Sequence, residues 1–128
     1  MVPISPGELL DKITILRIKS ARVRDATKLA NVQRELSLLE QTRGSALTLD
    51  AQLSAEEAEL ERVNAALWEI EDRLREHEAQ HLFDADFIEL ARSVYLRNDE
   101  RAAIKHRINR KLNSTIVEEK SYQPYHRP

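Results

Sequence analysis

The sequence predicts an all-α protein: an antiparallel bundle of about four helices, with long coiled-coil-like helices and an extended C-terminal tail. All four prolines lie near the chain ends, at positions 3, 6, 124 and 128, and the only glycines are Gly7 and Gly44. Charged residues make up 33% of the 128 residues. So few helix breakers among so many charged residues are typical of long helices. Because this length suits one domain, we assign residues 1–128 to a single helical-bundle domain.

The first helix is expected to begin at Ser5 and Pro6. A hydroxyl side chain caps a helix N-terminus, proline fits the first turn, and Glu8 complements the positive end of the helix dipole. Apolar residues then occupy two sides of the helix: Leu9, Ile13, Leu16 and Val23 on one, and Ile15 and Ile18 on the other. A helix with two apolar sides should be packed between neighbours.

A second helix is expected over residues 27–43, with Gly44 as its stop. Its apolar residues follow one stripe: Leu29, Val32, Leu36 and Leu39. The connection over residues 45–53 is ambiguous and could contain a short turn of helix. We therefore place the next helix start at Ser54, where the segment "SAEE" has the form of a capping box.

The third and fourth helices are expected to be the long ones. The third carries a coiled-coil-like seam of Leu60, Val63, Leu67, Ile70 and Leu74. The fourth begins at Asp84 or Asp86 and runs to about Asn113. At a rise of about 1.5 Å per residue, each of these helices is roughly 40 Å long.

The last residues, 114–128, differ in character from the helices. They contain β-branched residues, two prolines, Tyr122 and Tyr125, which favour an extended segment. We expect this tail to fold back on the bundle, with the two tyrosines as anchors; a disordered end is the alternative.

The seam of the fourth helix is interrupted by polar residues. Its positions are, in order, Phe87, Ala91, Val94, Asn98, Arg101, Lys105, Ile108 and Leu112, with Asn109 close to the same line. Buried charges cost several kcal/mol unless they are paired. Arg101 and Lys105 therefore require acceptors, for which the expected candidates are Glu71, Asp72, Glu118 and Glu119.

Two interpretations fit this polar seam. Polar residues within a helical seam can fix register or oligomeric state. Alternatively, Arg101 and Lys105 meet a small anionic ligand in a pocket walled by Trp68 and Tyr95. The candidate ligand-binding residues are Asn64, Trp68, Glu71, Arg75, Tyr95, Asn98, Arg101, Lys105, Asn109, Glu118, Glu119 and Tyr122; no catalytic residue is assigned.

Several functional classes are excluded or disfavoured. The chain has no cysteine, so it has no disulfide, thiolate metal site or cysteine nucleophile, and it lacks a glycine-rich phosphate loop. No signal peptide and no apolar run of about 20 residues is present, so we expect a soluble cytoplasmic protein that does not enter a membrane. His77 and His81 have helical spacing for zinc but no evident third ligand, and we predict neither metal nor cofactor.

The charges are unevenly distributed along the chain. Residues 54–78 contain nine acids and three bases, whereas residues 92–111 contain seven bases and two acids. A basic stretch can bind nucleic acid, but an acidic helix beside a basic one in the same bundle explains the pattern more simply. Nucleic acid is therefore not an expected partner.

Four segments carry a resemblance to a known family: "SPGELLDKITILRIK", "VNAALWEIEDRLR", "FDADFIELARSVYLRNDERAAIKHRIN" and "STIVEEKSYQPY". They resemble a bacterial family of unknown function whose members are helical proteins of about 130 residues that end in an IVEEKSY-type motif. The resemblance implies that this motif belongs to the domain, and it implies no catalytic role.

A looser similarity is to the small all-helical chorismate mutases, which place basic residues and a carboxylate around a dianion. A comparable set here would be Arg17, Glu71, Arg75, Arg101 and Lys105, although the first-helix spacing of those enzymes is not reproduced.

The favoured function is a non-catalytic binding or assembly module, most simply a homo-oligomer and in particular a dimer. The alternative is an enzyme or sensor for a small anion that uses Arg101 and Lys105.

Overall fold

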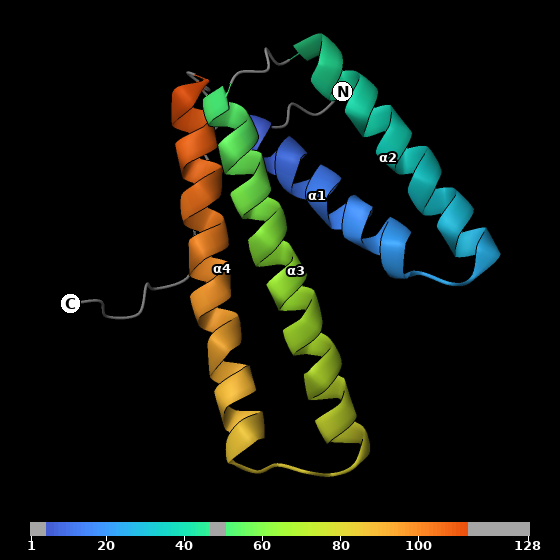
Figure 1. Cartoon of the computed structure of the whole chain (residues 1–128), viewed down its shortest axis with the longest axis vertical. Coiled ribbons are helices and arrows are strands. Elements are labelled where there is room, and N and C mark those ends of the chain that lie inside the picture. The colour runs from blue at the N-terminus through green and yellow to red at the C-terminus, as the bar shows by residue number, and fades with distance from the viewer. Residues whose placement is uncertain (1–4, 47–50, 113–128) are drawn as a thin grey trace.

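The computed structural model describes residues 5–46 and 51–112 (Figure 1). This part of the chain forms α1 (Pro6–Arg22), α2 (Ala26–Ala46), α3 (Ala51–Ala79) and α4 (Ala85–Lys111), and it contains no strand. The all-α prediction is therefore confirmed. The predicted tail, with Glu118, Glu119, Tyr122 and Tyr125, lies outside the described residues.

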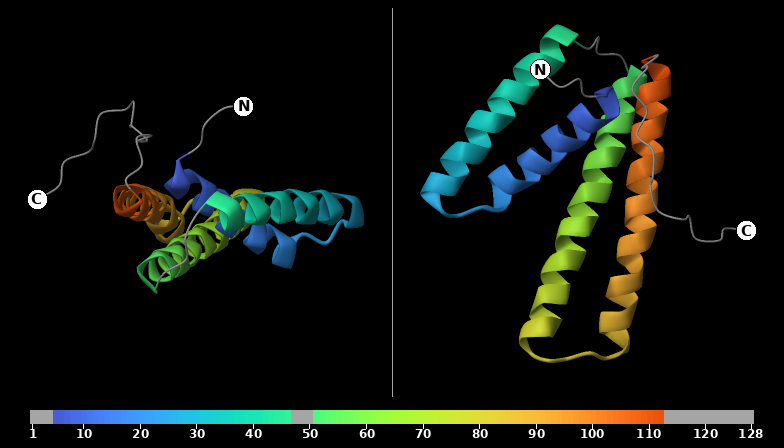
Figure 2. Two further views of the ribbon diagram at one scale, coloured as in Figure 1. Left: turned by 90° about the horizontal axis from the view of Figure 1, so that it is seen from above. Right: turned by 180° about the vertical axis from the view of Figure 1, so that it is seen from behind.

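The four helices form two antiparallel hairpins of unequal length. α3 and α4 pack together along the long hairpin, and α1 packs against α2, α3 and α4. The packing of α1 on all three other helices confirms that it lies between neighbours. α2 packs mainly along α1, so the shorter hairpin leans on one half of the longer one (Figures 1 and 2).

Local capping explains where α1 and α4 begin. The Ser5 hydroxyl accepts a hydrogen bond from the Glu8 backbone N–H at 3.2 Å, and Pro6 occupies the first turn. The Asp84 carboxylate accepts one from the Phe87 backbone N–H at 3.0 Å, which makes Asp84, and not Asp86, the cap of α4. Each cap satisfies an N–H group that has no partner within the helix.

Two predicted boundaries were wrong. α2 continues through Gly44 to Ala46, because an exposed glycine weakens a helix without ending it. α3 begins at Ala51, so Ser54 lies within its first turns and is not its cap. The earlier start places Leu53 on the helix, where its side chain is buried in the core; the burial of that side chain favours the longer helix.

The hydrophobic core lies where α1 crosses the open end of the long hairpin, which is formed by the N-terminal half of α3 and the C-terminal half of α4. Its buried residues are Leu9, Leu10 and Ile13 of α1, Leu53, Leu60, Val63 and Leu67 of α3, and Ile104 and Ile108 of α4. Leu36 and Leu39 of α2 pack against this cluster and are partly exposed. α1 is thus the central element, because it packs against each of the other three helices.

The other half of the long hairpin is thinly packed. We call residues 68–97 the distal hairpin; all of them are described, and among them only Leu90 is buried. Phe87 and Val94 are half-buried, while Leu82 and Phe83 at the turn are 45% and 54% exposed. None of the described helices is long and apolar enough to span a membrane.

Candidate functional site

The polar residues of the α4 seam meet side chains of α1 and α3 at one place, which we call the polar junction. Its members are Glu8, Asp11 and Thr14 of α1, Asn64 of α3, and Arg101, Lys105 and Asn109 of α4. The crossing of α1 over the long hairpin brings together residues from three distant parts of the sequence. Of the predicted candidates, Asn64, Arg101, Lys105 and Asn109 are in this cluster.

Asp11 is the central acceptor of the junction, and its side chain is only 1% exposed. Arg101 donates to both of its oxygens, from Nε to Oδ1 at 2.9 Å and from Nη2 to Oδ2 at 2.5 Å. Asn64 donates from Nδ2 to Oδ1 at 2.9 Å and also to the Thr14 hydroxyl at 2.9 Å. Thr14 in turn donates to the Asp11 carbonyl oxygen of its own helix. A bidentate guanidinium pair with these bonds compensates the cost of burying the carboxylate.

Lys105 carries the second positive charge of the junction. Its Nζ is 3.1 Å from Glu8 Oε2 and 3.9 Å from Asp11 Oδ2, and its side chain is 7% exposed. Two cations thus lie beside two carboxylates, and the four formal charges sum to zero. This balance stabilises the crossing of α1 on α4, and it reduces the attraction of the junction for a further anion.

Backbone contact between α1 and α4 is closest at Gly7. A Cβ atom at this position would lie 2.6 Å from the Lys105 carbonyl oxygen, so only glycine allows this approach. The Gly7 backbone N–H donates to Asn109 Oδ1 at 2.8 Å. Asn109 Nδ2 is buried and has no hydrogen-bond partner among the described residues. Gly7 and Asn109 thus define the depth at which α1 rests on α4.

The acceptors of Arg101 and Lys105 among the described residues differ from the predicted ones. Glu71 and Asp72 instead lie near Arg75 of their own helix, at 3.8 Å and 3.1 Å, on an exposed side of α3. The predicted acceptors on α3 were therefore wrong, because α1 and not the exposed side of α3 faces the seam. Glu118, Glu119 and Tyr122 lie outside the described residues.

Three other predicted residues lie apart from the junction network. Asn98 is exposed and Trp68 is half-buried. Tyr95 is 65% exposed and lies on the side of α4 that faces away from the core, so it does not form a wall with Trp68 over Arg101. The expected pocket between these two aromatic residues is not formed.

Sequence reasoning missed Asp11, Glu8 and Thr14 as members of the site. Glu8 was interpreted only as an acid near the helix start. The burial of Asp11 could have been predicted, because this residue lies between Leu10 and Ile13 on a helix predicted to be packed on two sides. An acid so placed needs a buried partner, and Arg101 is the residue that supplies it.

A separate group of ion pairs joins α1, α2 and α3 around Glu57. Its carboxylate is 3.0 Å from Arg17 Nη1 and 2.6 Å from Arg43 Nη2. Partial burial works to lower the pKa of Arg17, but the hydrogen bond and charge of Glu57 raise it above its ordinary value. The Arg17 guanidinium is therefore already paired with the acids of this group. The chorismate-mutase-like set does not converge, since Arg17, Arg75 and Arg101 each pair with a different acid.

His77 and His81 do not share one turn of helix, although their spacing had suggested it. α3 ends at Ala79, and His81 lies beyond the helix with a φ of 54°. His77 Nδ1 is 3.2 Å from the Leu82 carbonyl oxygen. Within the described residues no three histidine, aspartate or glutamate side chains are grouped to hold a metal ion.

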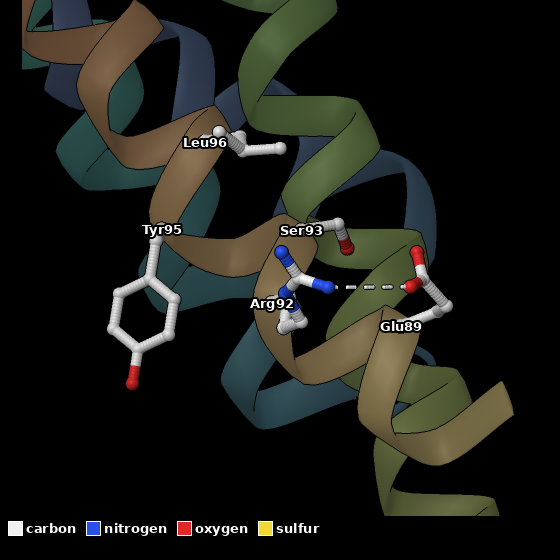
Figure 3. Close-up of a pocket in the computed structure, with 5 residues that line it drawn as sticks. All are labelled: Glu89, Arg92, Ser93, Tyr95 and Leu96. Atoms are coloured by element: carbon white, nitrogen blue, oxygen red, sulfur yellow. Dashed lines mark ion pairs between the residues drawn. The ribbon is translucent and has the colours of Figure 1, made fainter. Parts of the chain in front are cut away.

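A hollow of about 410 Å³ lies on α4, away from the junction. The described residues that line it are Glu89, Arg92, Ser93, Tyr95 and Leu96. Figure 3 shows the Tyr95 ring pointing away from the helix and Arg92 directed toward Glu89. The Arg92 Nη1 atom is 3.7 Å from Glu89 Oε1. Its lining therefore combines a paired arginine and glutamate with the apolar side chain of Leu96.

The sequence as a whole is similar to one known protein family. Residues 1–127 match a family of unknown function, DUF6165. The chain belongs to this family. No curated protein and no solved structure matches it significantly. The expected resemblance is therefore confirmed over nearly the whole chain, including the segment "IVEEKSY", and the family carries no assigned activity.

Proposed function

We propose that this DUF6165 protein is a non-catalytic assembly module that pairs with a second copy through the distal hairpin. The observation that carries the proposal is the single buried side chain, Leu90, among residues 68–97. Figures 1 and 2 show this half of α3 and α4 continuing beyond α1 and α2. Two helices alone leave one side of their shared seam uncovered.

Helices of this length depend on tertiary packing for most of their stability. In the distal hairpin Trp68, Phe87 and Val94 are half-buried, and Phe83 at the turn is exposed. Exposed apolar residues grouped in this way are typical of protein interaction surfaces. A second hairpin laid on this face would bury them and complete a four-helix arrangement.

The charge distribution favours an antiparallel pair. Residues 69–89 contain eight acids and two bases, whereas residues 92–111 contain seven bases and two acids. Two of those seven bases, Arg101 and Lys105, are already paired within the chain, so the other five carry the argument. When two copies lie antiparallel, the acidic end of each hairpin is beside the basic part of the other. Because a two-fold axis relates the two copies, this complementary contact occurs twice in the pair.

The polar junction has a structural role in this proposal. It holds α1 against the N-terminal half of α3 and the C-terminal half of α4. The distal hairpin is thereby left free to contact the partner. The alternative function, an enzyme or sensor for a small anion, has less support, because Glu8 and Asp11 already balance the charges of Lys105 and Arg101.

The proposal is tested by measuring mass in solution by light scattering over a range of protein concentrations. We expect twice the 14.8 kDa mass of the chain at high concentration. The variant Phe83→Glu should shift the midpoint of dissociation at least tenfold upward in concentration, because it places a charge in an apolar interface. The single tryptophan, Trp68, gives an independent reading, since its emission should move to the red on dissociation.

The matched control is Leu38→Glu, which makes the same kind of change at an exposed residue of α2. This variant should retain the mass of the unmodified protein. A monomeric mass at every concentration would contradict the proposal. So would equal weakening by both variants, because the distal hairpin would then have no special role.

A further inference from the structure

The short hairpin formed by α1 and α2 is strongly basic toward its turn. Residues 12–34 contain seven bases and one acid. Two of the seven bases, Arg17 and Arg22, are paired with acids of α3. We call four of the others, all of which are exposed, the basic end: Lys12, Lys19, Arg24 and Lys28. Within the described part of the chain none of these four forms an ion pair, and the one acid, Asp25, accepts a hydrogen bond from the Lys28 backbone N–H at 3.0 Å.

Lys12 and Lys19 continue the side of α1 that contacts α4 near the start of the helix. Glu8 has its carboxylate 3.1 Å from Lys105 Nζ of α4. It precedes Lys12 by four residues and Lys19 by 11, so these three residues share one side of α1. Farther along, the two helices diverge (Figure 1), and both lysines are exposed. A partner that lies beside α4 along the distal hairpin can therefore reach this side of α1.

The turn of the long hairpin carries the opposite charge. Glu76 and Glu78 lie in the last turn of α3, at the negative end of the helix dipole, where a carboxylate is unfavourable. Asp86 lies in the first turn of α4, and all three residues are exposed. We call these three residues the acidic turn. No lysine or arginine of the described ranges pairs with any of them, so a cation supplied from outside the chain would stabilise Glu76 and Glu78.

We propose that the acidic turn of one copy docks on the basic end of a second copy. This inference rests on the proposed pairing of distal hairpins and adds a second contact to it. Within one chain the two turns lie apart (Figures 1 and 2), so a contact between them involves two copies. Under a two-fold axis the contact forms twice, once for each acidic turn.

The antiparallel arrangement brings the two charged groups to the same level. In α4 the distal hairpin spans residues 85–97, with Ala91 at the middle, so Ala91 lies beside its own copy in a centred pair. The turn, about eight residues before Ala91, is then level with a position eight residues after it in the second copy, about 12 Å from the centre. Arg101 is two residues beyond that level, and its bonds to Asp11 mark where α1 leaves α4. The acidic turn therefore arrives about one helical turn from Lys12.

A second copy fits the basic end better than a nucleic acid does. A basic surface can bind phosphate groups, but residues 12–34 contain no aromatic side chain on which a base could stack. The second copy instead presents exposed carboxylates that lack a basic partner in their own chain. Complementary charge of this kind determines which partner is accepted and in which orientation.

Exchanging the charges of the two surfaces tests the proposal in the full-length protein. One variant carries Lys12→Glu and Lys19→Glu, and the other carries Glu76→Lys and Glu78→Lys. In each variant alone, like charges face each other in both contacts, so the midpoint of dissociation measured by light scattering should rise at least about tenfold in concentration. An equimolar mixture should recover the midpoint of the unmodified protein, because both contacts of the mixed pair then join opposite charges. Circular dichroism verifies that each variant is folded.

The matched control compares Lys19→Glu with Arg34→Glu, which makes the same charge change at another exposed base of the short hairpin. Arg34 is two residues from both Val32 and Leu36, which are half-buried, and therefore lies on the opposite side of α2. Lys19→Glu should weaken the pair, and Arg34→Glu should leave its midpoint unchanged. Equal effects of the two changes would overturn the proposal.

The other outcomes separate this contact from the pairing of distal hairpins. If the unmodified protein is dimeric but the charge-exchanged variants keep its midpoint, or their mixture does not recover it, the pairing stands and the contact between the turns is refuted. A monomeric mass for the unmodified protein would refute the pairing and this contact together. Binding of duplex DNA that is lost on Lys12→Glu and Lys19→Glu, with the mass of the pair unchanged, would assign the basic end to nucleic acid instead.

Discussion

Replacing Asp11 by Asn is the sharpest perturbation of the polar junction. The substitution preserves size but removes the charge that the Arg101 guanidinium and the Lys105 ammonium both face, at 2.5 Å and 3.9 Å from Oδ2. Removing one partner of a buried ion pair costs about 3–5 kcal/mol. Because the new amide retains one acceptor oxygen, we expect a loss near the lower end, about 3 kcal/mol. For a chain of this size that loss lowers Tm by roughly 10 °C.

The assay is urea denaturation followed by circular dichroism and by Trp68 emission, at fixed protein concentration because self-association would shift the midpoint. The matched control is Asp72→Asn, which makes the same chemical change in an exposed pair with Arg75 at 3.1 Å. An exposed pair of this kind contributes about 0.5 kcal/mol or less. If Asp11→Asn costs no more than Asp72→Asn, the junction does not hold the helices together and the reasoning fails.

A double-mutant cycle separates the Asp11–Arg101 pair from the other contacts. In an Arg101→Ala background the carboxylate has already lost its bidentate partner, and Lys105 and Glu8 remain. Asp11→Asn should then cost at least 1 kcal/mol less than it does alone, which is the range of coupling energies for residues in direct contact. Additive losses would show that the two residues act separately.

The two glycines and one helix cap supply the remaining predictions. Gly7→Ala should destabilise the fold by about 1–3 kcal/mol, because the new methyl group meets the Lys105 carbonyl at 2.6 Å; thermal unfolding measures the loss. The same change at Gly44, which has open space around it, should stabilise the protein by up to about 1 kcal/mol, and equal effects at both sites would contradict this account. Asp84→Ala removes the acceptor of the Phe87 N–H and should cost about 1 kcal/mol in urea denaturation, whereas an unchanged midpoint would show that the cap is not needed.

The helices themselves were predictable, because the signals that define them are local. Ser5 and Asp84 cap the helices that follow them by bonding to residues three positions away. The seam of α3 is readable as apolar residues three and four positions apart. The errors, at Gly44 and Ser54, occurred where a local signal was weaker than helix continuity and the burial of Leu53.

The presence of a polar site on α4 was also predictable, but its partners were not. Arg101 and Lys105 stand out in an apolar seam, and a buried charge needs an acceptor wherever it occurs. Which acid supplies it depends on how α1 crosses α4, and Asp11 is separated from Arg101 by 90 residues. Periodicity along one helix contains no information about that crossing.

The sequence by itself therefore determined four helices, the Ser5 cap of the first and the location of an unusual pair of cations, since each follows from contacts within a few residues. Only the tertiary structure decided that α1 lies across the long hairpin, that Glu8 and Asp11 neutralise those cations, and that residues 68–97 are left with one buried side chain. The physical reason is that these features arise from packing between helices, where the close approach at Gly7 selects one crossing.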